Sequence, residues 1–316
     1  MNIFEKQFKM FKPKKEEINE TERVSDLNKE TPNIEEKKET AFDDKIESTT
    51  EQIETAREIM GEKEVMGPDE IEKAFGIKLK PESIPSIPFS KEELQRAEEL
   101  NQFLVLRTDK APDGEPLTME KMNMMLTEKF KNEGEDKILH DPSGRGGGEK
   151  PQEFFNKNTP EFKWALTSKE LIPNTTNKDY LEQTAEAINY LKNQVFKGME
   201  IPKEYQEAIS EFDSRKDELR EWLATGDKDK YKSEISKLQI NHLIRQSPVE
   251  AMYDILMYYQ NNNERLLEYD LVWTDAIDSH DKHILFGGFD QDGLYVNGQS
   301  ENYQVSNLGT VFSRKF

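Results

Sequence analysis

The segment from Leu271 to Phe316 differs most from the rest of the chain, and it restricts the fold more than any other feature. Short apolar runs alternate there with Gly, Asn and Asp, a pattern typical of β-strands joined by turns. The fifty residues from Leu267 onward hold 8 of the 30 aromatic residues and 5 of the 16 glycines. The pair Asn297-Gly298 is a strong signal for a two-residue β-hairpin. The sequence therefore predicts a small β-rich unit at this end of the chain.

Bulk composition excludes several classes of protein. Charged residues make up 34% of the 316 residues, hydrophobic residues another 34%, and the mean hydropathy is −0.91, so a large part of the chain is expected to be solvated. A net charge of −20 argues against a general nucleic-acid binder. The lack of cysteine excludes disulfides, thiolate metal sites and cysteine nucleophiles. Since no apolar run approaches the ~18 residues of a membrane helix, we expect a cytoplasmic protein without a membrane span.

Charge runs and turn residues divide the chain into candidate units. The first part mixes charges of both signs without an apolar stripe, which is typical of disorder. The C-terminal unit has two possible starts, at residue 247 or as early as about residue 153. The expected units are a disordered acidic arm (1–86), a helical segment (87–140), a Gly-rich linker (141–152), a helical region (153–246) and the C-terminal unit (247–316).

Helices are expected through the middle of the chain. Ser90 with Glu93, and Ser247 with Glu250, form capping boxes that mark helix starts. Apolar residues at helical spacing follow both boxes, and the first stripe is expected to run as far as Leu104. The expected helices cover 53–60, 90–104, 119–130, 177–196, 202–225, 231–245 and 248–260.

No catalytic constellation is apparent. His280 and His283 could share a transition metal if a turn brought them together, but an exposed turn is the preferred interpretation. Asp290-Gln-Asp-Gly293 resembles the start of a calcium loop, yet its Gly comes two residues too early for an EF-hand. The Gly144–Gly148 run fits neither nucleotide-binding fingerprint. We therefore expect no enzyme and no cofactor.

Strand alternation separates inward from outward positions in the tail. The positions expected inward are Leu271, Trp273, Ile284, Leu294, Val296 and Val311. Other Tyr, Asn and Asp positions look free of packing constraints, and Tyr brings a large contact area at low entropic cost. The candidate ligand-binding residues are Asp275, Asp278, Phe286, Tyr295, Asn297, Gln299, Asn302, Tyr303 and Asn307. The alternative interpretation is a β-rich cap with polar turns and no ligand.

A resemblance to a known family covers roughly the last 55 residues. The matching residues are Asn261–Leu267, Trp273-Thr274, Gly288–Asp290, Asp292-Gly293 and Leu308–Arg314. They resemble the C-terminal end of the variable proteins of diversity-generating retroelements, whose codons are rewritten at template adenines by error-prone reverse transcription. In that family, a C-type-lectin-like fold carries the variable region.

The resemblance implies a fixed scaffold that presents changeable, ligand-contacting positions. The implied scaffold residues are Trp273, Phe289, Gly293, Leu308, Gly309, Phe312 and Arg314. The chain departs from lectins proper because it has no cysteine pairs and no Trp-Asn-Asp calcium ligands, so calcium-dependent sugar binding is not implied. Gly287-Gly288-Phe289 also stands where related domains have Gly-Gly-x-Trp.

Residues and resemblance together predict an α+β protein with a disordered acidic N-terminal arm, a helical middle region and a small C-type-lectin-like C-terminal domain. The expected function is binding of a protein ligand by a Tyr-, Asn- and Asp-rich surface that can be diversified. The alternative is a non-enzymatic helical adaptor whose C-terminal β unit only caps the helices.

Overall fold

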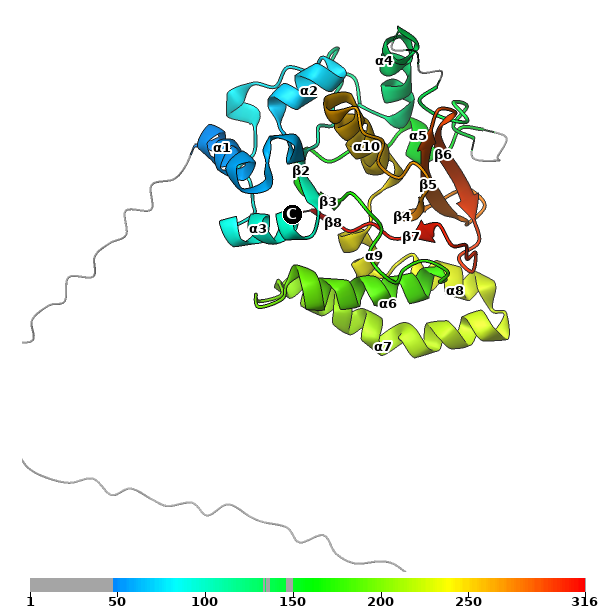
Figure 1. The fold of residues 1–316 in the computed structure, drawn as a ribbon. Helices are drawn as coiled ribbons and strands as arrows, with labels where there is room; N and C mark the ends of the chain where they lie inside the picture. Colours follow the sequence, from blue (N-terminus) through cyan, green and yellow to red (C-terminus); the bar gives the residue numbers. More distant parts are fainter. Residues whose placement is uncertain (1–47, 133, 135–136, 146–149, 316) are drawn as a thin grey trace, which may run out of the picture. The chain divides into compact units, whose positions relative to one another are not determined.

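The chain folds around two four-stranded sheets and a central helix (Figure 1). This computed structural model describes residues 48–132, 134, 137–145 and 150–315. The predicted disorder of residues 1–47 lies outside them. Residues 46–316 cluster into one unit. No helix in the described ranges is long and apolar enough to cross a bilayer.

Helices and short helical turns supply most of the regular secondary structure, and strands supply the rest, so the predicted α+β class is confirmed at that level. Their bounds in chain order are α1 (Thr49–Met60), η1 (Glu62–Glu64), α2 (Pro68–Phe75), η2 (Pro81–Ser83), α3 (Lys91–Glu99), α4 (Met119–Asn132), α5 (Glu153–Asn156), α6 (Tyr180–Tyr190), the π-helical turn η3 (Leu191–Val195), α7 (Lys203–Thr225), α8 (Lys228–Ile235), α9 (Gln239–Ile244) and α10 (Pro248–Asn262). Both predicted capping boxes are confirmed, at the starts of α3 and α10.

Residues 48–86 are ordered, so the prediction of disorder up to residue 86 is wrong for this stretch. Ser48 and Glu51 form a capping box at the start of α1, and Gly76 ends α2 in the left-handed conformation. Ile53 and Ile71 from these helices lie in the main hydrophobic core. A few buried side chains on each short helix are enough to hold it once partners from elsewhere in the chain cover them.

The first sheet joins the two ends of the described chain. Strand β1 (Val65–Met66) runs parallel to β2 (Gln102–Leu106), β2 pairs with β3 (Trp164–Ser168), and β3 pairs with β8 (Ser313–Lys315), the last two pairs being antiparallel. The helix predicted to continue to Leu104 instead ends at Glu99, and the chain turns into β2 through Asn101, whose φ is 53°. Since β8 completes this sheet, the tail is not a separable cap.

The second sheet contains the remaining tail strands in the order β6-β5-β4-β7. It consists of β4 (Leu271–Ile277), β5 (His283–Asp290), β6 (Gly293–Gln299) and β7 (Leu308–Gly309), with β7 parallel to β4 and the other pairs antiparallel. The hairpin predicted at Asn297-Gly298 is wrong, because both residues lie within β6 opposite β5. The turn is instead at Asp290–Gly293. Gly298 is needed for another reason, since a Cβ there would overlap the Asp278 carboxylate.

This second sheet lies between two hydrophobic cores. Val272, Ile284 and Phe286 share one face, which packs beside the almost fully buried helix α10 (Figure 1). Trp273 and Leu285 share the opposite face and join the core built from α6, α7, α8 and α9. The strands are therefore held from both sides, which makes the sheet a rigid support for the side chains at its surface.

Gly287 marks the closest approach of β5 to the chain before β4. Its φ is 137°, and a Cβ at this position would overlap the carbonyl oxygen of Asp270. We expect Gly287→Ala to lower the free energy of unfolding by about 1–3 kcal/mol through backbone strain, with the overlap adding to it. The matched control is Gly198→Ala, because Gly198 also has a positive φ of 83° but faces open space. Equal losses in urea unfolding for the two variants would contradict a role for the close approach.

Candidate functional site

A shallow groove lies over the outer part of the second sheet. Its volume is about 520 Å³. Leu271 and Leu285 line it. Leu285 belongs to the core under α6 and α7, and Leu271 packs against that core. Tyr295, Asn297 and Gln299 alternate along β6 and share a face with Leu285, because Leu285 pairs with Asn297 and the strand period is two. The groove thus has an apolar floor and polar walls.

Four of the nine candidate ligand-binding residues line this groove: Tyr295, Gln299, Tyr303 and Asn307. Asn297 lies between two of them on β6, and its amide donates a 2.7 Å hydrogen bond to the Tyr295 hydroxyl. Tyr303 is 37% exposed although it is a large hydrophobic residue. The structure therefore brings five of the candidates together on one face.

The prediction for Phe286 is wrong. Its side chain is fully buried, and it pairs with Val296 across β5 and β6 on the core face of the sheet. Ile284 and Phe286 are two residues apart in one strand and must therefore point to the same side. Since Ile284 was expected inward, the alternation rule already placed Phe286 inward too. A substitution at Phe286 would act on the core and not on a ligand surface.

The remaining three candidates lie apart from the groove lining. Asp278 is 7% exposed, and its carboxylate accepts hydrogen bonds from the backbone N–H groups of His280 and Lys282, so it shapes the turn between β4 and β5. Asp275 accepts a 3.4 Å contact from His242 on α9. This partner raises the pKa of His242. Asn302 is exposed in the turn after β6 and does not line the groove.

Several groove residues were not predicted from the sequence. Asp290 and Asp292 bring two carboxylates, and the Asp290 carboxylate accepts a 2.8 Å hydrogen bond from the backbone N–H of Asp292. His140 comes from a distant segment that bonds to β6, with its backbone N–H 2.9 Å from the Leu294 carbonyl oxygen. Its ring meets Tyr295 edge-on with centroids 6.1 Å apart. No local pattern around His140 signals this long-range contact.

The rim of the groove extends to Tyr269, the most exposed of the large hydrophobic residues, at 76%. The Asn307 amide donates a 2.8 Å hydrogen bond to the Tyr269 carbonyl oxygen, which places this loop beside the groove. A hydrogen bond with Glu268 raises the pKa of the Tyr269 phenol. Tyrosine, asparagine and carboxylate side chains therefore surround an apolar floor, and no lysine or arginine of the described residues lines the groove.

The implied scaffold positions are more buried than the candidate ligand-binding residues of the groove, and one of them, Gly293, also lines the groove. All seven are buried: Trp273, Phe289, Gly293, Leu308, Gly309, Phe312 and Arg314. Arg314 lies over the rings of Phe89 and Phe196 at 5.3 and 4.7 Å and also pairs with Glu93. The tail therefore divides into a buried set that supports the fold and a partly exposed set on the groove.

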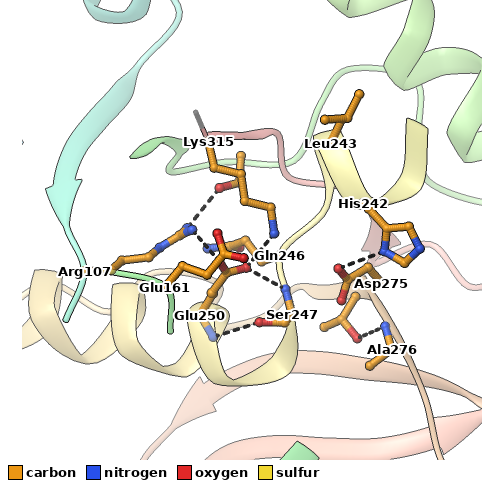
Figure 2. A network of polar contacts seen from close by, with 12 residues as sticks. Arg107, Glu161, His242, Leu243, Gln246, Ser247, Glu250, Asp275, Ala276 and Lys315 are labelled. Carbon is orange, nitrogen blue, oxygen red and sulfur yellow. Dashed lines mark hydrogen bonds and ion pairs between the residues drawn. The ribbon is translucent and has the colours of Figure 1, made fainter. Parts of the chain in front are cut away.

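A second polar cluster is buried under the first sheet (Figure 2). Arg107, which follows β2, donates to both oxygens of Asp254 at 3.0 and 2.6 Å and lies 3.0 Å from Glu250. Lys315 of β8 reaches the other Glu250 oxygen at 2.9 Å. Burial alone would raise the pKa of Glu250, but Arg107 and Lys315 outweigh it and hold the pKa at about 2. Burial raises the pKa of Asp254 despite Arg107.

This cluster, Arg107, Glu250 and Asp254 with Lys315, has a structural role, and we call it the clasp. Arg107, Glu250 and Asp254 expose 3% or less of their side chains, and each carboxylate already has a partner. Thr167 of β3 and Ser313 of β8 add hydrogen bonds to Asp254 and to Arg107. The clasp therefore fastens three strands to α10, leaving no open face for a substrate at these groups.

The two histidines considered as metal ligands do not come together. His283 is fully buried and stacks on Tyr180 with centroids 4.1 Å apart, whereas the His280 side chain is 58% exposed in the turn before β5. Within the described ranges, no three His, Asp or Glu side chains form a group that could hold a metal ion.

Comparison with known proteins adds no constraint on these surfaces. The chain matches no protein-family model, and no curated protein or solved structure was found to be similar to it.

Proposed function

We propose that the protein is a ligand-binding module that binds a protein ligand in the groove on the second sheet, and that the groove side chains can be exchanged without loss of the fold. The observation that carries this proposal is the separation of roles in the tail. Tyr295, Asn297, Gln299, Tyr303 and Asn307 gather at one surface, while the backbone beneath them is fixed by two cores.

The chemistry of the groove suits protein recognition. Tyrosine supplies contact area with few rotamers to freeze, and asparagine and glutamine can donate or accept hydrogen bonds as the partner requires. A groove of about 520 Å³ with an apolar floor can take one anchor side chain of a partner. The exposed Tyr269 extends the contact beyond the groove itself.

The resemblance to variable proteins of diversity-generating retroelements also supports a binding function for this surface. In such proteins the changeable positions are confined to a binding surface, which matches the confinement of the exposed set here. We also propose that the C-terminal domain has a C-type-lectin-like fold. A genomic observation tests it: a near-copy of the nucleotides encoding Trp273 to Arg314, differing mainly at adenines, should lie beside a reverse-transcriptase gene.

Exchange of the groove side chains should leave the protein folded. We expect a variant with serine at Tyr295, Asn297, Gln299, Tyr303 and Asn307 to lose less than about 2.5 kcal/mol in total. All five side chains are at least partly exposed, and changes at the surface usually cost up to about 0.5 kcal/mol each. Urea unfolding monitored by circular dichroism measures the loss. Cooperative unfolding at much lower urea, with a larger loss, would contradict the proposal that these side chains are free to vary.

A display experiment tests the binding function directly. A library randomised at the five groove positions is selected against a protein target such as lysozyme. The control library is randomised at five exposed α7 positions, Glu204, Glu207, Asp213, Asp217 and Glu221. We expect binders from the groove library alone. Binders from α7 alone would favour the alternative of a helical adaptor. Deleting the tail cannot separate these functions, because β8 belongs to the first sheet.

A further inference from the structure

A second groove lies on another part of the surface and shares no lining residue with the first. It has a volume of about 460 Å³, within the range of small-molecule sites. Three segments far apart in the sequence form it: the end of α3 with Asn101, the loop after β3 up to Asn174, and the end of α6 with the turn η3. This groove has no part in the binding function proposed above.

Three irregular backbone features meet at this groove. Asn101 and Asn174 have φ angles of 53° and 65°, in the left-handed region that residues other than glycine seldom adopt. Helix α6 continues into the π-helical turn Leu191–Val195, and such turns are rare and occur often at functional sites. Asn193 and Gln194 of that turn line the groove together with both left-handed asparagines. The irregular backbone thus places four amide side chains around one opening.

Apolar groups form one side of the groove, and one of them is fixed in place. Leu100 and Tyr190 are partly buried against the core under α6, and Leu171 is partly buried against the main hydrophobic core. Burial raises the pKa of the Tyr190 phenol. The Tyr190 ring also meets Phe312 edge-on at 6.1 Å. The aliphatic or aromatic part of a ligand can therefore pack against a preorganised surface, and binding does not have to order these side chains.

The charges that line this groove are all negative. Glu99, Glu170 and Glu186 are in the lining, and among residues 48–132, 134, 137–145 and 150–315 no lysine or arginine joins them there. Arg96 pairs with Glu99 and Lys178 pairs with Glu186, whereas the Glu170 carboxylate accepts a 3.2 Å hydrogen bond from the neutral Asn101 amide. Glu170 therefore offers the groove a carboxylate held in position by an uncharged partner.

We propose that this second groove binds a small organic cation. Its ammonium or guanidinium group would pair with the Glu170 carboxylate, and the amide oxygens of Asn174 and Asn193 would accept its remaining N–H groups. Its hydrocarbon chain would lie on Leu171 and Tyr190. Free small molecules are the fitting source, because the volume matches one such ligand and three chain segments bound the opening.

The test uses the full chain and agmatine, a four-carbon amine that carries a guanidinium group. Titration followed by ¹⁵N-¹H NMR should give saturable shifts at the side-chain amides of Asn101, Asn174 and Asn193. Pentanoate, of similar length and opposite charge, should give none. Raising the salt concentration should weaken the agmatine response because the contact is partly exposed. The five-serine variant of the first groove should bind agmatine unchanged, so the two proposals can fail separately.

Glu170→Gln should reduce the affinity for agmatine by about tenfold, the effect of losing one charge-assisted contact. The matched control, Glu200→Gln, alters an exposed glutamate outside the groove and should bind like the unmodified chain. If Glu170→Gln lowers the melting temperature, Asn193→Ala replaces it, because Asn193 is exposed. Three results would overturn the proposal: no saturable shift at millimolar agmatine, equal shifts with pentanoate, or unchanged agmatine binding by Glu170→Gln or the Asn193→Ala variant that replaces it.

Discussion

Replacing Arg107 by methionine should lower the free energy of unfolding by about 3–5 kcal/mol, because removing one member of a buried ion cluster leaves the others without compensation. Asp254 would lose both hydrogen bonds from the guanidinium, and Glu250 would keep only Lys315 as a charged partner. Neither carboxylate can turn to solvent, since both side chains are 3% exposed or less. Urea unfolding at pH 7 gives the comparison.

Two further variants identify the source of this loss. Arg220→Met changes an exposed arginine on α7 and should cost no more than about 0.5 kcal/mol. Adding Asp254→Asn to Arg107→Met removes the uncompensated charge and should recover part of the stability, since an amide costs less to bury than a carboxylate. If Arg107→Met cost less than about 1 kcal/mol, or if the second change deepened the loss, the clasp would not hold the strands to α10.

Local rules predicted the parts of this fold that depend on neighbouring residues. The boxes at Ser90 and Ser247 fix helix starts through hydrogen bonds within four residues, so sequence alone was sufficient there. The same holds for the end of α10, where Asn263 takes the left-handed conformation at φ 56°. Helix starts and stops of this kind require no knowledge of the rest of the chain.

Features set by distant contacts were missed. The apolar residues up to Phe103 and Leu104 fitted a helix as well as a strand. This segment forms a strand because it pairs with β1 and β3. Asn297-Gly298 fitted a hairpin turn, but β5 pairs with both residues and the chain instead turns at Asp292. Short patterns permit several structures, and the partner strand, which local spacing does not reveal, selects among them.

The candidate groove was predicted in part for the same reason. Tyr295, Tyr303 and Asn307 stood out because exposed tyrosine and asparagine in a β-rich tail have no packing role. His140 reaches the groove only through its backbone bond to β6, more than 150 residues along the chain. Alternation within a strand identifies a face, but it cannot tell which distant loop completes the surface.

Acid should destabilise the protein through His283, and Phe in its place should remove that contribution. His283 contacts the rings of Tyr180 and Trp273, and neither ring nitrogen of His283 has a hydrogen-bond partner among the described residues. Burial, together with the positive charges of Arg245 and Lys232, lowers the pKa of the imidazole to about 3. Its ordinary pKa is 6.5, so the unfolded chain binds a proton between these values and the folded chain does not.

The sign and size of the effect follow from this difference. Stability from His283 is complete above pH 6.5 and decreases as the pH falls toward 3, by about 1.4 kcal/mol per pH unit. Between pH 7.5 and pH 5 the unmodified chain should therefore lose about 2 kcal/mol more than His283→Phe, which keeps an aromatic ring against Tyr180 and has no titrating group. Urea unfolding at each pH, with both proteins in the same buffers, measures this difference.

The comparison between proteins cancels the other titrating groups. His242 acts in the opposite direction, because Asp275 raises its pKa and its contribution is lost as the pH rises, but it is present in both chains. His283→Leu separates titration from ring stacking: it should show the same flattened pH dependence with a loss of packing energy that is equal at every pH. Parallel pH profiles for the unmodified chain and His283→Phe would mean that the buried imidazole accepts its proton without cost, and hence that solvent reaches it beside Tyr180 and Trp273.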